Sequence, residues 1–242
     1  MAIGYTSDYE MQLLAGDPIK LNDYITLTIP SLRQIKESDE KEYSMGVSKL
    51  CATSYDIKLY LYDMNIDYED IKDYDVFLML YRNISPELFL LLLGVDLTKC
   101  EMEMKDESII LTKDGVQIFD RFTYTKMVQI IRDAHGFQRN YKIAGNKFTK
   151  QFYIDDDRKN LKKPPKEYKS ALGPYISSMV NTSGFKYNYS TVWDITMYQL
   201  IDAVKRIGLR DNYKNIMNGV YTGNIKGTDV SKKELDWLRR FD

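Results

Sequence analysis

Two different hydrophobic periods follow one another in residues 100–136, and they set the fold class. Acidic and apolar residues alternate in residues 100–104, which is the period of a half-buried strand, and two more strand-like runs follow at 108–111 and 116–119. From Thr123 onward the apolar residues recur at the spacing of a helix. A β-meander followed directly by an amphipathic helix predicts an α+β fold.

The first thirty residues contain short apolar runs separated by turn residues. We interpret residues 11–14, 19–21 and 24–29 as strands, with a tight hairpin at Asn22-Asp23 between the last two. Pro30 ends this run because proline cannot donate to a strand ladder. The sequence therefore predicts a β-rich beginning to the chain.

Helices are expected in the stretch that follows. Ser31 and Gln34 have the spacing of a capping box, and acidic residues after Ser38 suit the positive end of a helix that runs toward Leu50. Another helical stretch spans residues 56–64, where Tyr55, Tyr60 and Tyr62 either pack internally or form a binding face, and internal packing is favoured. The run Ser85-Pro86-Glu87 is typical of a helix start and Gly94 of a helix stop, so residues 87–93 form a short buried helix.

The second half of the chain is expected to be helical after a linker. Periodicity fades and lysines accumulate in residues 141–170, and Pro164-Pro165 blocks helix continuation. Helices resume at 166–179, and further helices are expected at 211–217 and 232–240, the last with Ser231 and Glu234 at capping-box spacing.

A long apolar stripe lies between these C-terminal helices. It follows Ser190, ends at Gly208, and consists of Trp193, Met197, Leu200, Ile201, Val204 and Ile207. We therefore predict three parts: an acidic α+β domain in residues 1–140, a basic linker in 141–165 and a basic helical domain in 166–242.

Charge is divided between the two halves of the chain. Residues 1–121 contain 12 Lys and Arg against 23 Asp and Glu, and the remainder contains 22 against 12, so net charges of -11 and +10 lie side by side in one chain. Opposite potentials steer encounters and are screened by salt. The two halves can attract each other within one molecule, molecules can associate head to tail, or the basic half can meet an acidic partner.

Catalytic chemistry is not indicated by any motif. His135 is the only histidine and stands where a helix ends, so we interpret it as a cation at a helix C-terminus and not as a general base. Cys51 and Cys100 are far apart and form no close-spaced ligand pair, and Asp155-Asp156-Asp157 reads as a charged loop and not a calcium loop. We expect a protein that is not an enzyme and has no metal and no cofactor.

Composition places the chain inside a cell and outside the membrane. The longest apolar stretch, residues 88–95, is too short to span a bilayer and is expected to belong to the core. Residues 1–10 lack the basic start and apolar run of a secretory signal. The expected location is the cytoplasm, with no membrane partner.

Residues 141–169 have a composition that is typical of a nucleic-acid-binding surface. Residues 141–169 interleave lysines that contact phosphates with aromatic residues that stack on bases. The candidate residues for nucleic acid or an acidic partner are Lys142, Lys147, Lys150, Phe152, Tyr153, Lys162 and Lys163. A protein partner and a plain solvated linker are the alternatives.

The order of these parts resembles a known family. The run Val192-Trp193-Asp194-Ile195-Thr196-Met197-Tyr198-Gln199-Leu200-Ile201-Asp202 is similar to a run in tail assembly chaperones or tail morphogenesis proteins of bacteriophages that infect Gram-positive bacteria. Those proteins often carry an aromatic-Asp-Leu-Thr-x-Tyr-Gln-Leu-x-Asp pattern before a basic helix. The resemblance in detail covers the C-terminal third of the chain.

The resemblance implies a non-enzymatic protein that binds the tape-measure protein and prevents its aggregation during virion morphogenesis. The partner-binding residues that it implies are Trp193, Tyr198 and Gln199, with Lys205 and Arg206 beside them. The β-meander is not a feature of that family. A structural neck or baseplate subunit of the virion, self-association through the oppositely charged halves, and nucleic-acid binding through residues 141–169 therefore stay open as alternatives.

Overall fold

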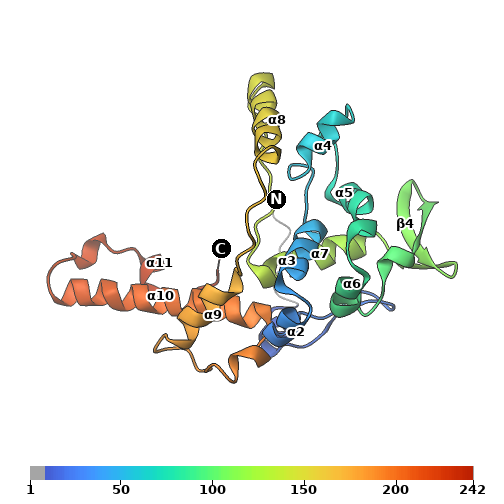
Figure 1. Ribbon diagram of the computed structural model, residues 1–242. Helices are drawn as coiled ribbons and strands as arrows, with labels where there is room; N and C mark the ends of the chain where they lie inside the picture. Colours follow the sequence, from blue (N-terminus) through green and yellow to red (C-terminus); the bar gives the residue numbers. More distant parts are fainter. Residues whose placement is uncertain (1–8, 242) are drawn as a thin grey trace.

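The fold is α+β, as the sequence predicts. The computed structural model describes residues 9–241, in which two small antiparallel sheets lie in the N-terminal half and helices make up the C-terminal part (Figure 1). Most of residues 1–10, where a secretory signal is not expected, lie outside the described residues.

The chain begins with a helix where we predicted a strand. Helix α1 (Glu10–Ala15) replaces the strand expected at residues 11–14, and it ends at Gly16, whose φ of 78° is the left-handed conformation that glycine adopts readily. Short apolar runs do not distinguish a buried strand from a helix by periodicity. Packing decides, because α1 lies against the long C-terminal helix.

The predicted hairpin is present and is fixed by one asparagine. Strands β1 (Ile19–Lys20) and β2 (Thr26–Leu27) pair antiparallel. The side-chain oxygen of Asn22 accepts hydrogen bonds from the backbone N–H groups of Tyr24 and Ile25, and its amide nitrogen donates to the carbonyl oxygen of Ile118 at 2.9 Å. The turn is therefore tied to the meander far along the chain.

Short helices then build most of the N-terminal core. They are α2 (Leu32–Glu37), α3 (Glu40–Leu50), α4 (Lys58–Asp63), α5 (Asp73–Leu80), the 3-10 helix η1 (Tyr81–Asn83) and α6 (Pro86–Leu93). The capping box of Ser31 and Gln34 and the Ser85 cap are confirmed, and α6 is buried and ends at Gly94 as expected. The cap of α3 is Asp39 and not Ser38.

The tyrosines around α4 divide between core and surface. Tyr55 is buried as we predicted, whereas Tyr60 and Tyr62 are exposed, so the prediction of internal packing is wrong for these two residues.

The meander and the helix after it match the expected order. The 3-10 helix η2 (Leu97–Lys99) leads into β3 (Glu101–Lys105), β4 (Ser108–Lys113) and β5 (Val116–Phe119), which pair as neighbours in one antiparallel sheet. Helix α7 (Arg121–His135) follows, capped by Asp120, and its apolar face carries Tyr124, Met127 and Ile131 into the core.

The segment predicted as an irregular linker contains a helix. Helix α8 (Lys147–Leu161) is capped by Asn146, and the three consecutive aspartates lie on it, so their interpretation as a loop is wrong. Ile154 is buried in a small second cluster with Tyr55, Leu59, Leu61 and Tyr68. The contact with α4 supplies the packing that a weakly periodic helix needs.

The C-terminal helices differ from the prediction in where they begin and end. They are α9 (Leu172–Val180), η3 (Val192–Asp194), α10 (Met197–Tyr221), η4 (Gly227–Asp229) and α11 (Lys232–Leu235). Helix α10 runs through Gly208, which we predicted as a stop, and includes the helix expected separately at 211–217. Gly208 is not among the glycines with positive φ, and one interior glycine costs a helix only about 1 kcal/mol.

One hydrophobic core joins the two halves. Side chains of α2, α3, α5, α6 and α7 form it together with Ile176, Met179, Val192, Ile195 and Leu200 from the C-terminal part. The main-chain N–H of Leu32 donates to the carbonyl oxygen of Ile195 at 2.9 Å, which places η3 beside α2. The division into domains at residues 140 and 165 stays a prediction.

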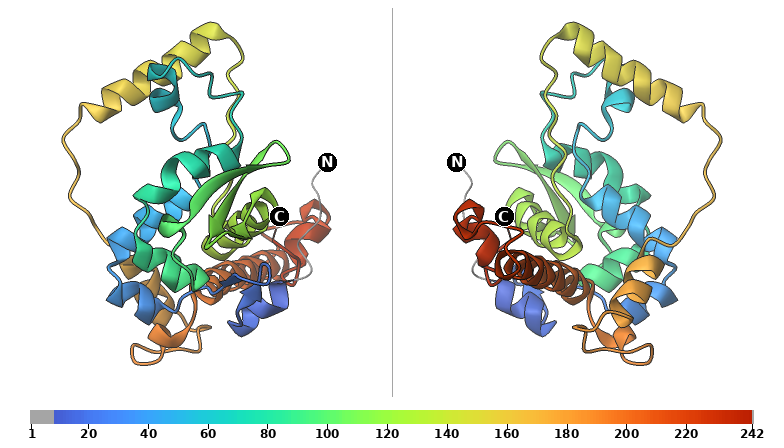
Figure 2. Two further views of the ribbon diagram at one scale, coloured as in Figure 1. Left: turned by 90° about the vertical axis from the view of Figure 1, so that its right-hand side faces the viewer. Right: turned by 90° about the vertical axis from the view of Figure 1, so that its left-hand side faces the viewer.

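Three projections leave this body. The α4–α8 lobe rises on one side, the β3–β4 hairpin lies on another, and the distal part of α10 extends away before the chain turns back along it through α11 (Figure 1). An extended strap connects α8 back to α9 (Figure 2).

Candidate functional site

The beginning of α10 is the best-fixed part of the region that we predicted to bind partners. Thr196 and Gln199 form a capping box, in which the Gln199 side-chain oxygen accepts from the main-chain N–H of Thr196 at 2.8 Å. The Gln199 amide nitrogen also donates to the carbonyl oxygen of Leu14 at 2.8 Å. Gln199 therefore caps both α1 and α10. The oxygen and the nitrogen of its side-chain amide each form a hydrogen bond within the molecule. The Thr196–Gln199 spacing is a signal in the sequence that we missed.

Trp193 lies in η3 and not on the stripe of α10, which begins at Met197. Its indole N–H donates to the carbonyl oxygen of Tyr189 at 2.9 Å, its ring packs against the core, and Lys36 lies 5.1 Å from the ring centroid. The helical stripe that we predicted from Trp193 to Ile207 is thus wrong at its first member. An extended residue, Ile195, separates it from the helix.

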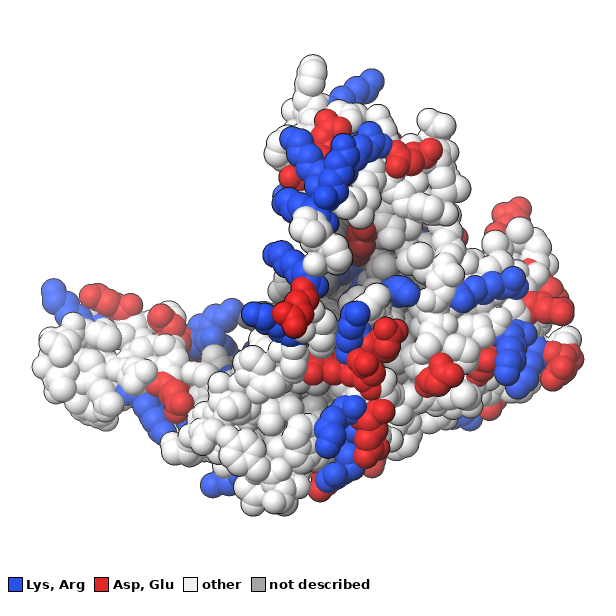
Figure 3. Space-filling view, viewed as in Figure 1, with Lys and Arg blue, Asp and Glu red and all other residues white. Residues whose placement is uncertain are grey.

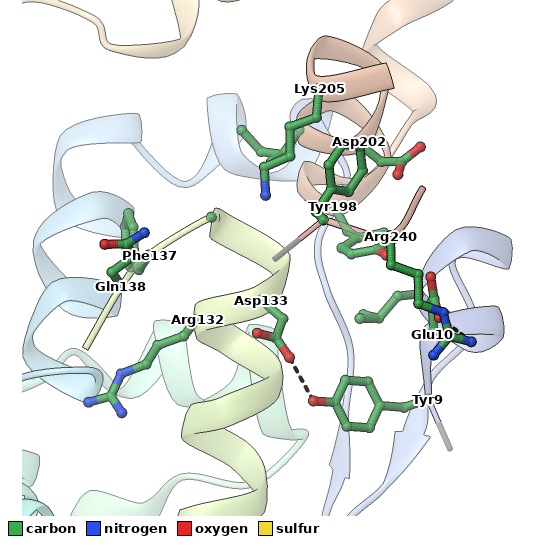
Figure 4. A pocket seen from close by; sticks show the side chains of 14 residues that line it. Tyr9, Glu10, Arg132, Asp133, Phe137, Gln138, Tyr198, Asp202, Lys205 and Arg240 are labelled. Atoms are coloured by element: carbon green, nitrogen blue, oxygen red, sulfur yellow. Dashed lines mark hydrogen bonds and ion pairs between the residues drawn. The ribbon is translucent and has the colours of Figure 1, made fainter. Parts of the chain in front are cut away.

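A cavity of about 350 Å³ is lined by two of the five predicted partner-binding residues (Figure 4). It lies where α1, the end of α7, α10 and residues 240–241 meet. Tyr198 and Lys205 line it, and Arg206 is adjacent on α10. The lining is Tyr9, Glu10, Leu13, Arg132, Asp133, Gly136, Phe137, Gln138, Tyr198, Ile201, Asp202, Lys205, Arg240 and Phe241.

Carboxylates and phenols share this cavity. The Tyr9 hydroxyl donates to Asp133 Oδ2 at 2.6 Å (Figure 4), and burial together with this hydrogen bond raises the pKa of Tyr9. Burial raises the pKa of Tyr198 to about 12, and burial also raises the pKa of Asp202 above its usual range. The groups are therefore partly desolvated, which strengthens the polar contacts that they make.

Cations on α10 hold the segment that forms one wall of the cavity. The Arg206 guanidinium carbon lies 4.3 Å from the centroid of the Phe241 ring, and Lys205 Nζ lies 5.3 Å from the same centroid. Arg206 Nη1 also donates to the carbonyl oxygen of Arg239 at 2.7 Å. Both positive side chains that we predicted as partner contacts thus bind an aromatic residue of the same chain.

The residues predicted for nucleic acid lie on or beside α8. Lys150 forms ion pairs with Asp67 and Glu69, and Lys142 lies 4.5 Å from the centroid of the Tyr153 ring, which is half-buried. Phe152 is exposed, as are Lys147, Lys162 and Lys163. In Figure 3, acidic side chains are interspersed with the basic ones over this lobe. On the face shown, the basic side chains are interrupted by acidic ones, unlike a continuous basic track that follows a nucleic-acid backbone.

Ion pairs between the acidic and basic halves occur within the molecule. Besides Lys150, Arg158 of α8 pairs with Asp63, and Lys58 Nζ lies 2.5 Å from Asp157 Oδ2. Arg33 of α2 pairs with Asp194 at 2.8 Å. The pairs of Lys150 and Arg158 join a base of the basic half to an acid of the acidic half, whereas Lys58–Asp157 and Arg33–Asp194 join the minority charges of each half. All three interpretations of the charge division stay predictions.

His135 is at the end of α7 as predicted, but it is not a cation. It is buried, and burial lowers its pKa to about 4. The imidazole is therefore neutral at physiological pH, because burial in a medium of low dielectric constant outweighs the attraction of the helix C-terminus. Our interpretation of His135 as a charged helix end is wrong.

The distal C-terminal part has an unusual surface. No residue in the described range 201–241 is buried, although the range contains a helix of several turns. Large apolar side chains are exposed there, namely Tyr221, Ile225, Leu235, Trp237 and Leu238. We call residues 208–241 the C-terminal arm. The sequence shows its apolar residues but not their exposure.

The described residues contain neither a candidate metal cluster nor a candidate membrane span. In residues 9–241, no group of three His, Cys, Asp or Glu side chains is placed to hold a metal ion. None of the described helices is both long and apolar enough to cross a membrane.

Similarity to known proteins is confined to the C-terminal third. Residues 162–242 match the family model described as the YomV second domain, a name that comes from a phage-type protein of Bacillus. The matched region contains α9, α10 and the C-terminal arm, and it indicates a phage-related protein. No curated protein and no solved structure matches the chain.

Proposed function

We propose that this protein is a non-enzymatic phage assembly protein that binds other tail proteins, the tape-measure or tube protein, while the tail forms in the host cytoplasm. The observation that carries the proposal is the C-terminal arm, in which helical residues 208–221 project from the body without one buried side chain. An isolated helix of this length is marginally stable in water and gains stability by packing an apolar face.

The exposed side chains suit a protein partner. Tyr221 and Leu238 are 80% and 68% exposed, and Trp237 lies between Leu238 and α11. Tyrosine, tryptophan and leucine give large contact areas, and aromatic residues dominate binding energy in protein interfaces. The same region matches a phage-type family, which supports a partner among phage proteins.

The test is affinity purification of the tagged full-length chain from cells that produce the phage, with the bound proteins identified by mass spectrometry. We expect the tape-measure or tube protein to be recovered. Substituting Tyr221 and Leu238 by serine should abolish the recovery, because both side chains are exposed and their loss leaves the core intact. The matched control is Phe122→Ser, since Phe122 is 83% exposed at the start of α7 and is not part of the arm.

The two alternatives give different results. A neck or baseplate subunit would be recovered in purified virions in fixed stoichiometry, whereas an assembly factor is absent from them. A nucleic-acid-binding protein would bind single-stranded oligonucleotides with an affinity that falls steeply with salt. If no tail protein is recovered and one of these two results is obtained, the corresponding alternative replaces the proposal.

A further inference from the structure

We propose that the groove between α1, α7 and α10 is a peptide-binding groove, occupied in this structure by the chain's own residues 239–241, and that a basic–aromatic segment of a partner displaces them. The inference deepens the proposed function, because it names the chemistry of the partner segment. The groove is the cavity of about 350 Å³ together with the wall that residues 240–241 form.

One arginine recognises two features of the bound segment. Arg206 donates a hydrogen bond to the carbonyl oxygen of Arg239 and stacks its guanidinium group on the ring of Phe241, two residues further on. Asp202, one helical turn before Arg206 on α10, has its Oδ1 atom 3.7 Å from Arg206 Nε. A carboxylate in this position holds the guanidinium plane across the groove, where it can meet both the main chain and the aromatic ring.

The groove also selects the residue before the aromatic ring. Arg240 reaches back toward α1, where its Nη2 atom lies 4.0 Å from Glu10 Oε2 (Figure 4). If residues 239–241 leave, Arg240 leaves with them, and the carboxylates of Glu10 and Asp202 remain at the rim. A basic side chain followed by an aromatic one therefore fits the groove better than an acidic segment does.

The chain's own segment is held loosely enough to be exchanged. Its contacts with α1 and α10 are one hydrogen bond, stacking of two cations on one ring, and an ion pair in which the Arg240 side chain is 74% exposed, while Arg239 also bonds to the carbonyl oxygens of Lys233 and Asp236 within the arm. Residues 239–241 are not part of either hydrophobic core, so their release uncovers no buried cluster. Such contacts at the surface are individually weak and are screened by salt.

The segment also leaves part of the groove empty. The cavity remains beside Phe241, and its walls include Leu13, Tyr198 and Ile201, which present apolar and aromatic surface. An aromatic side chain that enters this space would bury apolar area against Leu13, Tyr198 and Ile201. A partner segment can therefore compete with the tethered one, although the tethered segment has an effective concentration in the millimolar range.

The test measures binding of a labelled peptide with the sequence of residues 236–241 by fluorescence anisotropy. The titrated proteins are the full-length chain, F241A, F241A combined with R206A, and F241A combined with K214A. Lys214 is the matched control because it lies on the same helix, is exposed, and does not line the cavity.

We expect F241A to bind the peptide at least about 10-fold more tightly than the unmodified chain, because the competing tethered segment has lost its ring. Adding R206A to F241A should abolish this gain in affinity, whereas adding K214A should not change it. A peptide with alanine in place of phenylalanine should not bind. Equal affinity of F241A and the unmodified chain, or indifference to R206A, overturns the proposal. An F241A chain that circular dichroism shows to be unfolded also overturns it, since residues 239–241 would then be structural.

The outcome is separate from that of the proposed function. The peptide experiment uses purified protein and a synthetic peptide, so it can succeed when no tail protein is recovered from cells. Conversely, a tail protein that binds the arm but is insensitive to R206A and F241A would leave the proposed function standing without this groove.

Discussion

The Tyr43 hydroxyl donates a hydrogen bond to Nε2 of His135, with the two atoms 2.6 Å apart in the buried contact between α3 and α7. The direction follows from the other ring nitrogen. Nδ1 lies 2.7 Å from the carbonyl oxygen of Ile131, which can only accept, so Nδ1 carries the proton and Nε2 is the acceptor. Burial raises the pKa of Tyr43, so the hydroxyl keeps its proton.

Removing this donor should destabilise the fold. Tyr43→Phe leaves Nε2 of His135 buried without a partner, and we expect a loss of about 1–3 kcal/mol in the free energy of unfolding. Urea denaturation measures it. Tyr24→Phe is the control, because Tyr24 is 60% exposed and its substitution should change stability by less than about 0.5 kcal/mol. Equal effects of the two substitutions would show that the buried hydrogen bond is not stabilising.

Stability should fall with acid because of His135. Above pH 6.5 the imidazole is neutral in both the folded and the unfolded chain, but between pH 6.5 and about 4 only the unfolded chain binds the proton. Unfolding therefore becomes easier as pH falls through this window, by roughly 3 kcal/mol once the pH is below the folded pKa.

The measurement is the free energy of unfolding at several pH values for the chain and for His135→Gln. The glutamine variant does not titrate, so its stability should decline less between about pH 7 and 4.5 than that of the unmodified chain. Carboxylates titrate in both proteins and largely cancel in the comparison. Parallel pH curves for the two proteins would contradict the prediction.

Asp73 should be among the most sensitive positions of the chain. Its carboxylate accepts from Arg139 Nε at 2.8 Å and lies 3.4 Å from Nη2 of Arg132, whose side chain is only 7% exposed. Asp73→Ala leaves the Arg132 guanidinium buried with the carbonyl oxygen of Cys51 as its hydrogen-bond partner. We expect a loss of about 3–5 kcal/mol. Thermal or urea unfolding measures it, with the exposed Asp70→Ala as a control that should be nearly neutral.

The α4–α8 lobe should open independently of the body. Ile154 is fully buried in the small cluster with Tyr55 and Tyr68. Ile154→Ala removes this packing, and such a substitution at a core site lowers the free energy of unfolding by about 2–5 kcal/mol. We expect limited proteolysis to cut residues 141–171 faster while the rest of the chain stays resistant. Phe152→Ala, at a side chain that is 63% exposed on the same helix, should leave the cleavage rate unchanged.

Local signals predicted several elements correctly. The capping box of Ser31 and Gln34, the Ser85 cap with Gly94 as the stop of α6, and the meander of β3–β5 all rest on contacts between residues close in sequence. Such signals act within a few residues, so one chain segment contains all of the information.

Errors occurred where distant parts of the chain decide. Residues 11–14 are helical because α1 packs on α10, and α8 forms because Ile154 finds the cluster around α4. The positive charge expected for His135 is absent because residues of α3 enclose its ring. In the candidate site, the sequence placed Tyr198, Lys205 and Arg206 on one helix, but their neighbours Tyr9 and Phe241 come from the two ends of the described chain.

The sequence by itself thus determined the α+β class, the starts of α2, α6 and α11, the hairpin at Asn22 and the opposite charges of the two halves. The tertiary structure decided that the halves share one core, that α4 and α8 pair charges in a separate lobe, and that residues 201–241 remain unburied. The physical reason is the sequence separation over which each kind of interaction acts. Capping and periodicity act between near neighbours, whereas burial depends on which distant surfaces meet.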